Sequence, residues 1–161
     1  MAEKKKKRGG FSSGDILEIN LGDNSFGYCK VLKVDNFAPI FQIYSEILGH
    51  SIGLAEFMNL NWTRKSVVYI NSAAVKREWY FIGNVEVTSA ELCWQPFFFG
   101  TSSSVWTVEF SDGSRQRISP DESSYTRMLS EGYIHKISHL CPAVVSHVKD
   151  DRKMAWKGSP L

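Results

Sequence analysis

Three histidines in the C-terminal third of the chain come close to the spacing of metal ligands. His135 and His139 are four residues apart, as two ligands on one turn of a helix would be, and His147 follows them. Zinc proteases of the H-E-x-x-H type carry a glutamate between two such histidines, and no carboxylate lies between His135 and His139. We therefore interpret these histidines as polar surface residues and predict neither a metal nor a cofactor.

Three carboxylates near the start of the chain offer a second kind of chemistry. Asp15, Glu18 and Asp23 lie close together in the sequence, and a pair of carboxylates can act as general acid and general base. Carboxylates at strand ends more often support turns and solubility, so we predict a structural role. A small hydrolase or nuclease stays an alternative, with four candidate residues: Asp15, Asp23, His135 and His139.

Nucleophilic and phosphate-binding motifs are missing from the sequence. It contains no G-x-S-x-G, no P-loop and no G-x-G-x-x-G. The cysteines, Cys29, Cys93 and Cys141, are odd in number and widely spaced, and no two of them form a C-x-x-C pair. We expect free thiols rather than a disulfide framework or a zinc site. These observations give no strong sign of catalysis, although a Ser/His or Cys/His arrangement can form in space without a local motif.

An aromatic run, WQPFFF at residues 94–99, is the most unusual feature of the sequence. Such a run can stack bases, but base stacking normally comes with interleaved lysine or arginine, and none lies in this run. Core packing is our first interpretation, and binding of a protein partner through exposed aromatic side chains is the second. The candidate partner-binding residues are Tyr28, Trp79, Tyr80, Trp94, Phe97 and Phe98.

Charge and composition limit the classes of protein that fit. The chain has 161 residues, is 43% hydrophobic and carries a formal net charge of +2. A basic stretch at residues 4–8 accounts for this charge, so the rest of the chain is nearly neutral and has no evident basic face for nucleic acid. No apolar segment approaches a signal peptide or the roughly 20 residues of a membrane span, so we expect a cytoplasmic protein.

The elements that must position these residues are mostly short strands. Leu17, Ile19 and Leu21 alternate with polar residues, which predicts a strand over 15–21 with one face exposed to solvent. A turn at 22–24 leads to a strand over 26–34, in which Gly27 suggests a bulge. Further elements are predicted as strands at 39–44, 66–70 and 79–87, and as short helices at 51–60 and at 72–77, the latter capped by Asn71.

A second section of the chain begins near Thr88. Strands at 105–110 and 115–118 are predicted to form a hairpin, with Asp112-Gly113 as a type I′ turn. A helix is predicted to begin at Ser119 and to end at Gly132. The pattern of residues 133–148 indicates ordered chain but does not distinguish helix from strand.

Together these elements predict an α+β fold dominated by β-structure. We expect a bent antiparallel sheet or a small SH3-like barrel, with a second β-hairpin and one or two helices. The predicted organisation is a disordered basic tail at 1–13, a single domain at 14–148 (a β section at 14–87 and an extension at 88–148), and a loose C-terminal tail at 149–161.

Two separated blocks of the sequence form a pattern that is common to one protein family. The first is GDILEI at residues 14–19, continued by LGD at 21–23 and FGYCKVL at 26–32, and the second is KREWYFIGN at 76–84. This pattern resembles the immunity protein 26 family of bacterial polymorphic toxin systems. The resemblance covers roughly residues 14–86, and the chain departs from the pattern at Cys29 and in its long second section. It implies a non-enzymatic inhibitor that binds one cognate toxin domain in the cytosol.

Another reading competes with the one that the resemblance implies. Small barrels that open with a Gly-Asp strand often bind nucleic acid, and the basic stretch at residues 4–8 would assist such binding. This alternative predicts salt-dependent binding that weakens when residues 4–8 are removed. The nearly neutral body of the chain does not suggest mimicry of nucleic acid, which would need a strongly acidic surface.

Overall fold

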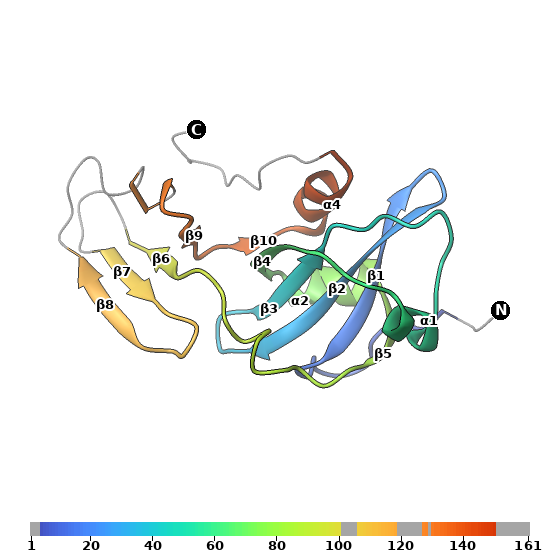
Figure 1. Ribbon diagram of the computed structural model, residues 1–161, viewed down its shortest axis with the longest axis horizontal. Helices are drawn as coiled ribbons and strands as arrows, with labels where there is room; N and C mark the ends of the chain where they lie inside the picture. Colours follow the sequence, from blue (N-terminus) through green and yellow to red (C-terminus); the bar gives the residue numbers. More distant parts are fainter. Residues whose placement is uncertain (1–3, 101–105, 119–126, 129, 151–161) are drawn as a thin grey trace. The chain divides into compact units, whose positions relative to one another are not determined.

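The contacts within the chain divide it into two units. The computed structural model describes residues 4–100, 106–118, 127–128 and 130–150 (Figure 1). Unit 1 comprises the described residues up to Val87 together with those from Ser138 onward, and unit 2 comprises those from Thr88 to Ile137. The chain leaves unit 1 after Val87, where the second section was predicted to begin, and returns to it at Ser138. That residues 14–148 form a single domain stays a prediction.

Unit 1 is built on a six-stranded sheet in the order β10-β4-β3-β2-β1-β5 (Figure 1). The strands are β1 (Asp15–Gly22), β2 (Ser25–Val34), β3 (Pro39–Tyr44), β4 (Arg64–Ile70), β5 (Tyr80–Asn84) and β10 (Ser138–His139). All neighbours are antiparallel except β10, which pairs with β4 in parallel. The predicted α+β class is confirmed. In the described part of unit 1 the sheet ends at β10 and β5, so it is an open sheet and not a closed barrel.

Strand β1 is buried on both faces, although its alternating pattern predicted one solvent face. Leu17 and Ile19 belong to one core of unit 1, while Ile16 belongs to a second core on the opposite face. The second face is covered by helix α1 (Leu54–Asn59) and its flanking segments. Glu18 shares this face with Ile16 and is therefore enclosed as well.

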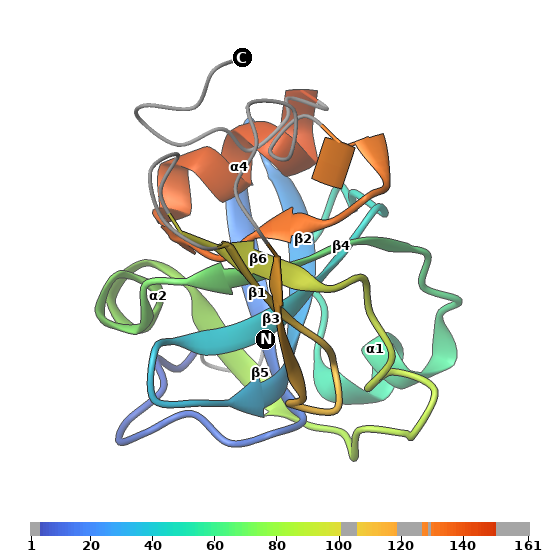
Figure 2. The same ribbon diagram turned by 90° about the vertical axis from the view of Figure 1, so that its left-hand side faces the viewer.

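The larger core of unit 1 lies under helices α2 (Ser72–Glu78) and α4 (Cys141–Asp150). As predicted, Asn71 caps α2, because its side-chain oxygen accepts a hydrogen bond of 3.1 Å from the Ala74 N–H. Figure 2 shows α2 and α1 on opposite sides of the strands. The sheet thus has a helical cover on each face, and α4, which the sequence left open, supplies part of the cover over the larger core.

Unit 2 contains a four-stranded sheet in the order β8-β7-β6-β9. Its strands are β6 (Phe97–Phe99), β7 (Trp106–Glu109), β8 (Arg115–Ile118) and β9 (Ile134–His135). Strand β9 pairs with β6 in parallel and the other pairs are antiparallel. The core of unit 2 consists of Phe98, Trp106, Val108 and Met128. The aromatic run therefore contributes core packing, which was its first interpretation.

The two hairpin turns differ from each other in type. Asp23 and Asn24 both have positive φ, 52° and 56°, as a two-residue type I′ turn requires. In the β7–β8 hairpin only Gly113 has positive φ, and the Phe110 N–H donates to the Ser114 carbonyl. This is a three-residue loop with a glycine bulge, so the type I′ prediction for Asp112-Gly113 is wrong.

The predicted helix at Ser119 lies largely outside the described residues. Its end is visible, because the Tyr133 N–H donates to the Met128 carbonyl at 2.8 Å and Gly132 has φ +84°. This pattern closes a helix by a left-handed glycine, as predicted. Within the described ranges, no helix has the length and apolar character needed to cross a membrane.

Candidate functional site

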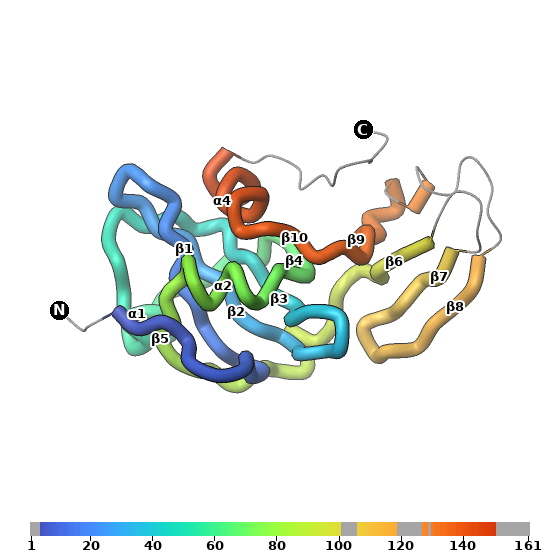
Figure 3. The backbone as a smooth tube through the Cα atoms, turned by 180° about the vertical axis from the view of Figure 1, so that it is seen from behind, coloured from blue at the N-terminus to red at the C-terminus, as the bar shows by residue number. Residues whose placement is uncertain are grey.

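The basic stretch at residues 4–8, called the lysine segment below, lies along the outer edge of β5. The Phe81 N–H donates to the Lys5 carbonyl at 2.8 Å, and the two residues form an antiparallel bridge. Figure 3 shows this N-terminal segment, in dark blue, running beside β5. The disordered tail predicted over 1–13 stays a prediction. The described residues 4–13 contact the edge of the sheet and two buried carboxylates.

The first of these carboxylates is Glu18, whose side chain is only 1% exposed. The ammonium of Lys4 lies 2.7 Å from its Oε1, and Oε2 accepts hydrogen bonds from the Tyr28 hydroxyl (2.8 Å) and the Ser51 hydroxyl (2.6 Å). The Ile52 N–H donates in turn to the Tyr28 oxygen at 3.2 Å. A buried carboxylate persists only when it is paired and hydrogen-bonded, and Glu18 meets both conditions.

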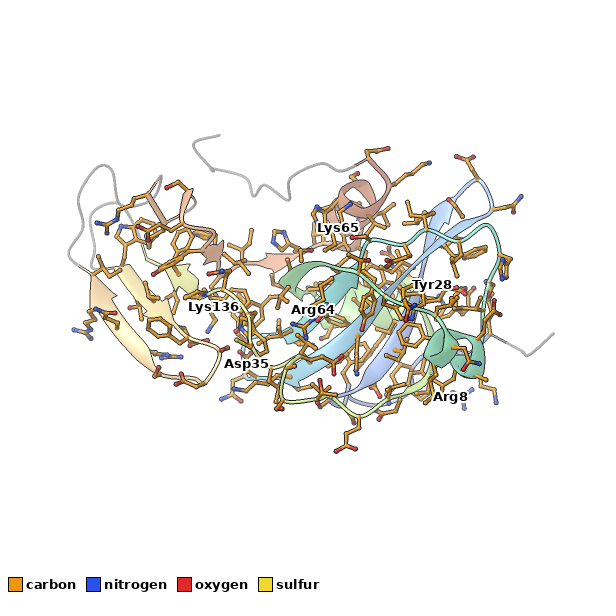
Figure 4. All side chains as sticks on the ribbon, viewed as in Figure 1. Arg8, Tyr28, Asp35, Arg64, Lys65 and Lys136 are labelled. Carbon is orange, nitrogen blue, oxygen red and sulfur yellow. The ribbon has the colours of Figure 1, made fainter. Side chains whose placement is uncertain are left out.

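Tyr28 links this polar group to the second core. Its ring lies 5.3 Å from that of Trp62 and 6.2 Å from that of Phe57, and Figure 4 shows it between β2 and α1. Burial raises the pKa of the Tyr28 phenol above its ordinary value, and the hydrogen bond to Glu18 raises it further. Tyr28 therefore acts as a hydrogen-bond donor to Glu18 at neutral pH.

The second buried carboxylate is Asp15, also 1% exposed. Its Oδ2 lies 3.0 Å from the Lys7 ammonium and accepts a hydrogen bond from the Ser12 N–H, while Oδ1 accepts one from Asn84. Asp23, in contrast, is 87% exposed and pairs with Lys149 at 3.1 Å. All three carboxylates thus have partners within the chain, and the structural role predicted for them stays a prediction.

Aromatic rings complete the surroundings of the lysine side chains. The Lys4 ammonium lies 4.5 Å from the ring centre of Phe26 and 5.1 Å from that of Tyr80. The Lys6 ammonium lies 3.9 Å from Tyr80, and the Lys7 ammonium lies 4.5 Å from Phe81. Lys4 thus sits between a carboxylate and two ring faces, which is an arrangement that binds ammonium groups.

Most of the aromatic residues proposed from the sequence as partner contacts are core residues. Tyr28, Trp79, Phe97 and Phe98 are buried, so the expectation that they are exposed is wrong. Other parts of the chain cover these four side chains, and the sequence pattern did not show that cover. Tyr80 and Trp94 are half-buried, and their role in partner contact stays a prediction.

Large apolar side chains are exposed elsewhere, at positions that the sequence did not single out. The most exposed of these are Met58 in α1 (63%), Leu140 (61%) and Phe37 (52%). A single apolar residue in a loop or at a helix end carries no periodic signal, and only the fold shows whether it is covered. Scattered exposed apolar residues are common in soluble proteins, so they indicate candidates rather than a site.

The histidines are not arranged as ligands on one helix. His135 lies in β9 and His139 in β10, and His139 is buried, so the prediction that it is a surface residue is wrong. His147, in α4, lies with its Nε2 2.9 Å from the Ser66 hydroxyl and links α4 to β4. In the part of the chain that the structure describes, no group of three His, Cys, Asp or Glu side chains is placed to hold a metal ion.

The three cysteines are free thiols, as predicted. Cys29 and Cys141 are buried, and burial raises the pKa of both, that of Cys141 to about 12. Cys93 is exposed. A thiol is nucleophilic only as its thiolate, so the two buried cysteines are poorly suited to catalysis.

Comparison with known protein families gives a match to immunity protein 26 over residues 12–105. The chain belongs to the immunity protein 26 family. The match begins just before β1 and extends beyond residue 86, where the resemblance noted from the sequence ended, to include β6 and the aromatic run. A search of curated proteins and a search of solved structures return no match. The role of this member of the immunity protein 26 family is thus that of an immunity protein in general terms.

Proposed function

We propose that this immunity protein binds and neutralises one cognate bacterial toxin domain, without catalysis, in the cytoplasm of the producing cell. The observation that carries the proposal is the family match, which covers more than half of the chain. The engagement of Asp15 and Glu18 with lysines and hydrogen-bond donors supports a structural rather than a catalytic role for them.

Binding of nucleic acid was the alternative function, and its main support was the lysine segment. In unit 1, however, the Lys4 and Lys7 side chains are paired with Glu18 and Asp15. Charges that are paired within the chain contribute less to binding phosphates, because the internal ion pairs must be broken first. This observation favours a protein partner over nucleic acid.

The exposed end of α1 is our proposed contact with the toxin. Met58 lies in the last turn of α1 and Leu60 follows the helix as its C-cap, and both are exposed. Exposed apolar side chains at the centre of an interface commonly contribute most of the binding energy. Tyr80 and Trp94, the half-buried residues among the six sequence candidates, are proposed as further contacts.

The proposal is tested by affinity capture of the tagged full chain from native lysate after nuclease treatment, followed by mass spectrometry. We expect one stoichiometric protein partner whose isolated domain is toxic to bacteria and whose toxicity is abolished when this chain is co-expressed. A recovered partner whose toxicity is unchanged, or recovery of nucleic acid alone when nuclease is omitted, would contradict it.

The contact at α1 is tested on the same pair of proteins. Met58→Ser is expected to weaken toxin binding at least about tenfold, since a central apolar contact contributes over 1 kcal/mol. Leu140→Ser is the matched control, because Leu140 is equally exposed but lies just before α4, which covers the opposite face of the sheet from α1. Equal effects of the two variants would show that α1 is not the specific contact.

A further inference from the structure

We propose that the acidic and aromatic site beside β5 is a receptor for an extended basic segment of the toxin, and that the lysine segment is its internal occupant. This inference rests on the proposed function, which supplies the toxin as partner. The site is defined by five residues, Glu18, Asp15, Phe26, Tyr80 and Phe81.

The charges of the site require a cation. The side chains of Glu18 and Asp15 are each almost completely buried. The Lys4 ammonium lies 2.7 Å from the Glu18 carboxylate, and the Lys7 ammonium lies 3.0 Å from the Asp15 carboxylate. Removing one partner of such a pair leaves an uncompensated charge, which is far more costly than exchanging that partner for another cation. The lysine segment can therefore leave the site readily only when another basic group takes its place.

The geometry of the site selects an extended chain rather than a single cation. The side chains of Lys4 and Lys6 contact the Tyr80 ring, whereas Lys7 contacts the ring of Phe81, the next residue of β5. Alternate side chains of an extended segment point to opposite faces, and the Lys5–Phe81 backbone bridge lies between them. The segment thus meets the edge of β5 through one isolated β-bridge, which resembles the strand-addition mode of peptide recognition.

A double glycine separates the lysine segment from a fixed anchor. After Gly9 and Gly10, the Phe11 ring packs edge-on against Phe41 at 5.7 Å, and the Ser13 hydroxyl donates to the Leu32 carbonyl. A Cβ placed at either glycine would meet no atom within 4 Å, and Gly9 has φ +80°. Rotation at these glycines would release residues 4–8 and leave the anchor in the core.

The lysine segment indicates the chemistry of the external occupant. A competitor must supply two cations with the spacing of Lys4 and Lys7 on an extended chain, together with a carbonyl for the Phe81 N–H. A basic segment of a toxin meets these requirements, and binding there would cover the positive charges of the toxin with Glu18 and Asp15. Until the toxin binds, the lysine segment supplies the two cations and the carbonyl that the site requires.

The test uses a fluorescent peptide with the sequence of residues 3–11, EKKKKRGGF, as probe and the full chain as receptor. Fluorescence anisotropy compares the wild-type chain with the Lys4→Gln/Lys7→Gln variant. The matched control is Lys5→Gln/Arg8→Gln, which removes the same charge but keeps both ion pairs and the Lys6 contact with the Tyr80 ring. We expect the first variant to bind the peptide at least tenfold more tightly than the wild type and the control.

Adding Glu18→Gln to the Lys4→Gln/Lys7→Gln variant should remove this gain, because the glutamine keeps the acceptor for Tyr28 but not the charge. Equal binding by all chains, or a gain that persists with Glu18→Gln, would overturn the proposal. Circular dichroism checks that each variant is folded. If the double variant does not fold, Lys4→Gln alone makes the same comparison against Lys5→Gln.

Experiments with the toxin recovered by affinity capture then distinguish a failure of this inference from a failure of the proposed function. Competition between toxin and peptide, with tighter toxin binding to the Lys4→Gln/Lys7→Gln variant, supports the inference. A toxin that is neutralised but does not compete with the peptide overturns the site and leaves the function intact. Light scattering that shows a dimer dissociated by the peptide would assign the site to a second copy of the chain and also overturn it.

Discussion

Glu18 illustrates how much of this protein depends on one buried side chain. Its carboxylate joins three separate parts of unit 1, namely the lysine segment, Tyr28 in β2 and Ser51 before α1. Each of these groups would lose its partner in the absence of the carboxylate. The strand pattern predicted Glu18 as a solvent-facing residue, so its importance comes from the enclosure of the second face of β1.

Glu18→Ala is expected to lower the free energy of unfolding by about 3 kcal/mol, because it leaves a lysine and two hydroxyl groups without their acceptor. Urea denaturation of the full chain measures this loss. Asp23→Ala is the control, since its carboxylate is 87% exposed and its ion pair is expected to contribute less than about 1 kcal/mol. Similar losses in both variants would contradict the role given to Glu18.

The raised pKa of Tyr28 predicts that the folded chain loses stability at alkaline pH. Its pKa is raised in the folded chain, so above about pH 10 the folded state holds a proton that the unfolded state releases, and stability falls as pH rises. The Cys29 and Cys141 thiols act in the same direction. Denaturation curves at neutral pH and above pH 10 should therefore show a smaller pH effect in Tyr28→Phe than in the wild type. An identical pH effect in both chains would show that Tyr28 does not contribute.

At the scale of elements, the junction between the lysine segment and β1 depends on a glycine. Gly14 has φ +92°, its N–H donates to the Val31 carbonyl at 2.7 Å, and its carbonyl accepts from the Val85 N–H at 2.9 Å. A Cβ at this position would lie 2.5 Å from the Val85 carbonyl oxygen. The Gly14-Asp15 pair is thus needed for two reasons: the backbone requires glycine at position 14, and the Asp15 side chain pairs with Lys7.

Gly14→Ala is expected to destabilise unit 1 by about 2 kcal/mol or more, from left-handed strain and contact with the backbone of residue 85. Gly10→Ala is the matched control: it has open space, and its change should stay within about 1 kcal/mol. Thermal unfolding followed by circular dichroism compares the two. A larger effect at Gly10 than at Gly14 would contradict this account of the junction.

At the scale of the whole molecule, packing follows the two units and not the order of the sequence. Helix α4 comes after all of unit 2 in the chain, yet its Cys141, Val144 and Val148 side chains belong to the larger core of unit 1. The core of unit 2 is separate and centres on Phe98 and Val108. Local stability is expected to follow this division.

Val144→Ala should therefore increase hydrogen exchange in β1 to β4 and leave β6 to β8 unchanged, with a loss of about 2 kcal/mol for the cavity. Val108→Ala, at an equally buried position of unit 2, should show the reverse pattern. Hydrogen exchange followed by mass spectrometry on the intact chain measures both. Uniform changes across the two units in either variant would contradict the division.

Signals between neighbouring residues were enough to predict most of the local elements of this protein. Apolar alternation predicted most strands, Asn71 predicted the start of α2, and Gly132 predicted the end of a helix, because these signals act through neighbours a few residues apart. The family resemblance was also carried by local blocks, and the match to immunity protein 26 confirms it. The turn type at Asp112-Gly113 was predicted wrongly, because an Asp-Gly pair fits both two-residue and three-residue loops.

Which faces are covered and which distant segments meet became clear only from the folded chain. The burial of Glu18, the parallel pairing of β10 with β4 and the docking of the lysine segment on β5 all join residues far apart in the sequence. No periodic pattern records such contacts, because a charged residue has the same place in the alternation whether water or another element covers it. Burial depends on how the whole chain packs and not on any local stretch of its sequence.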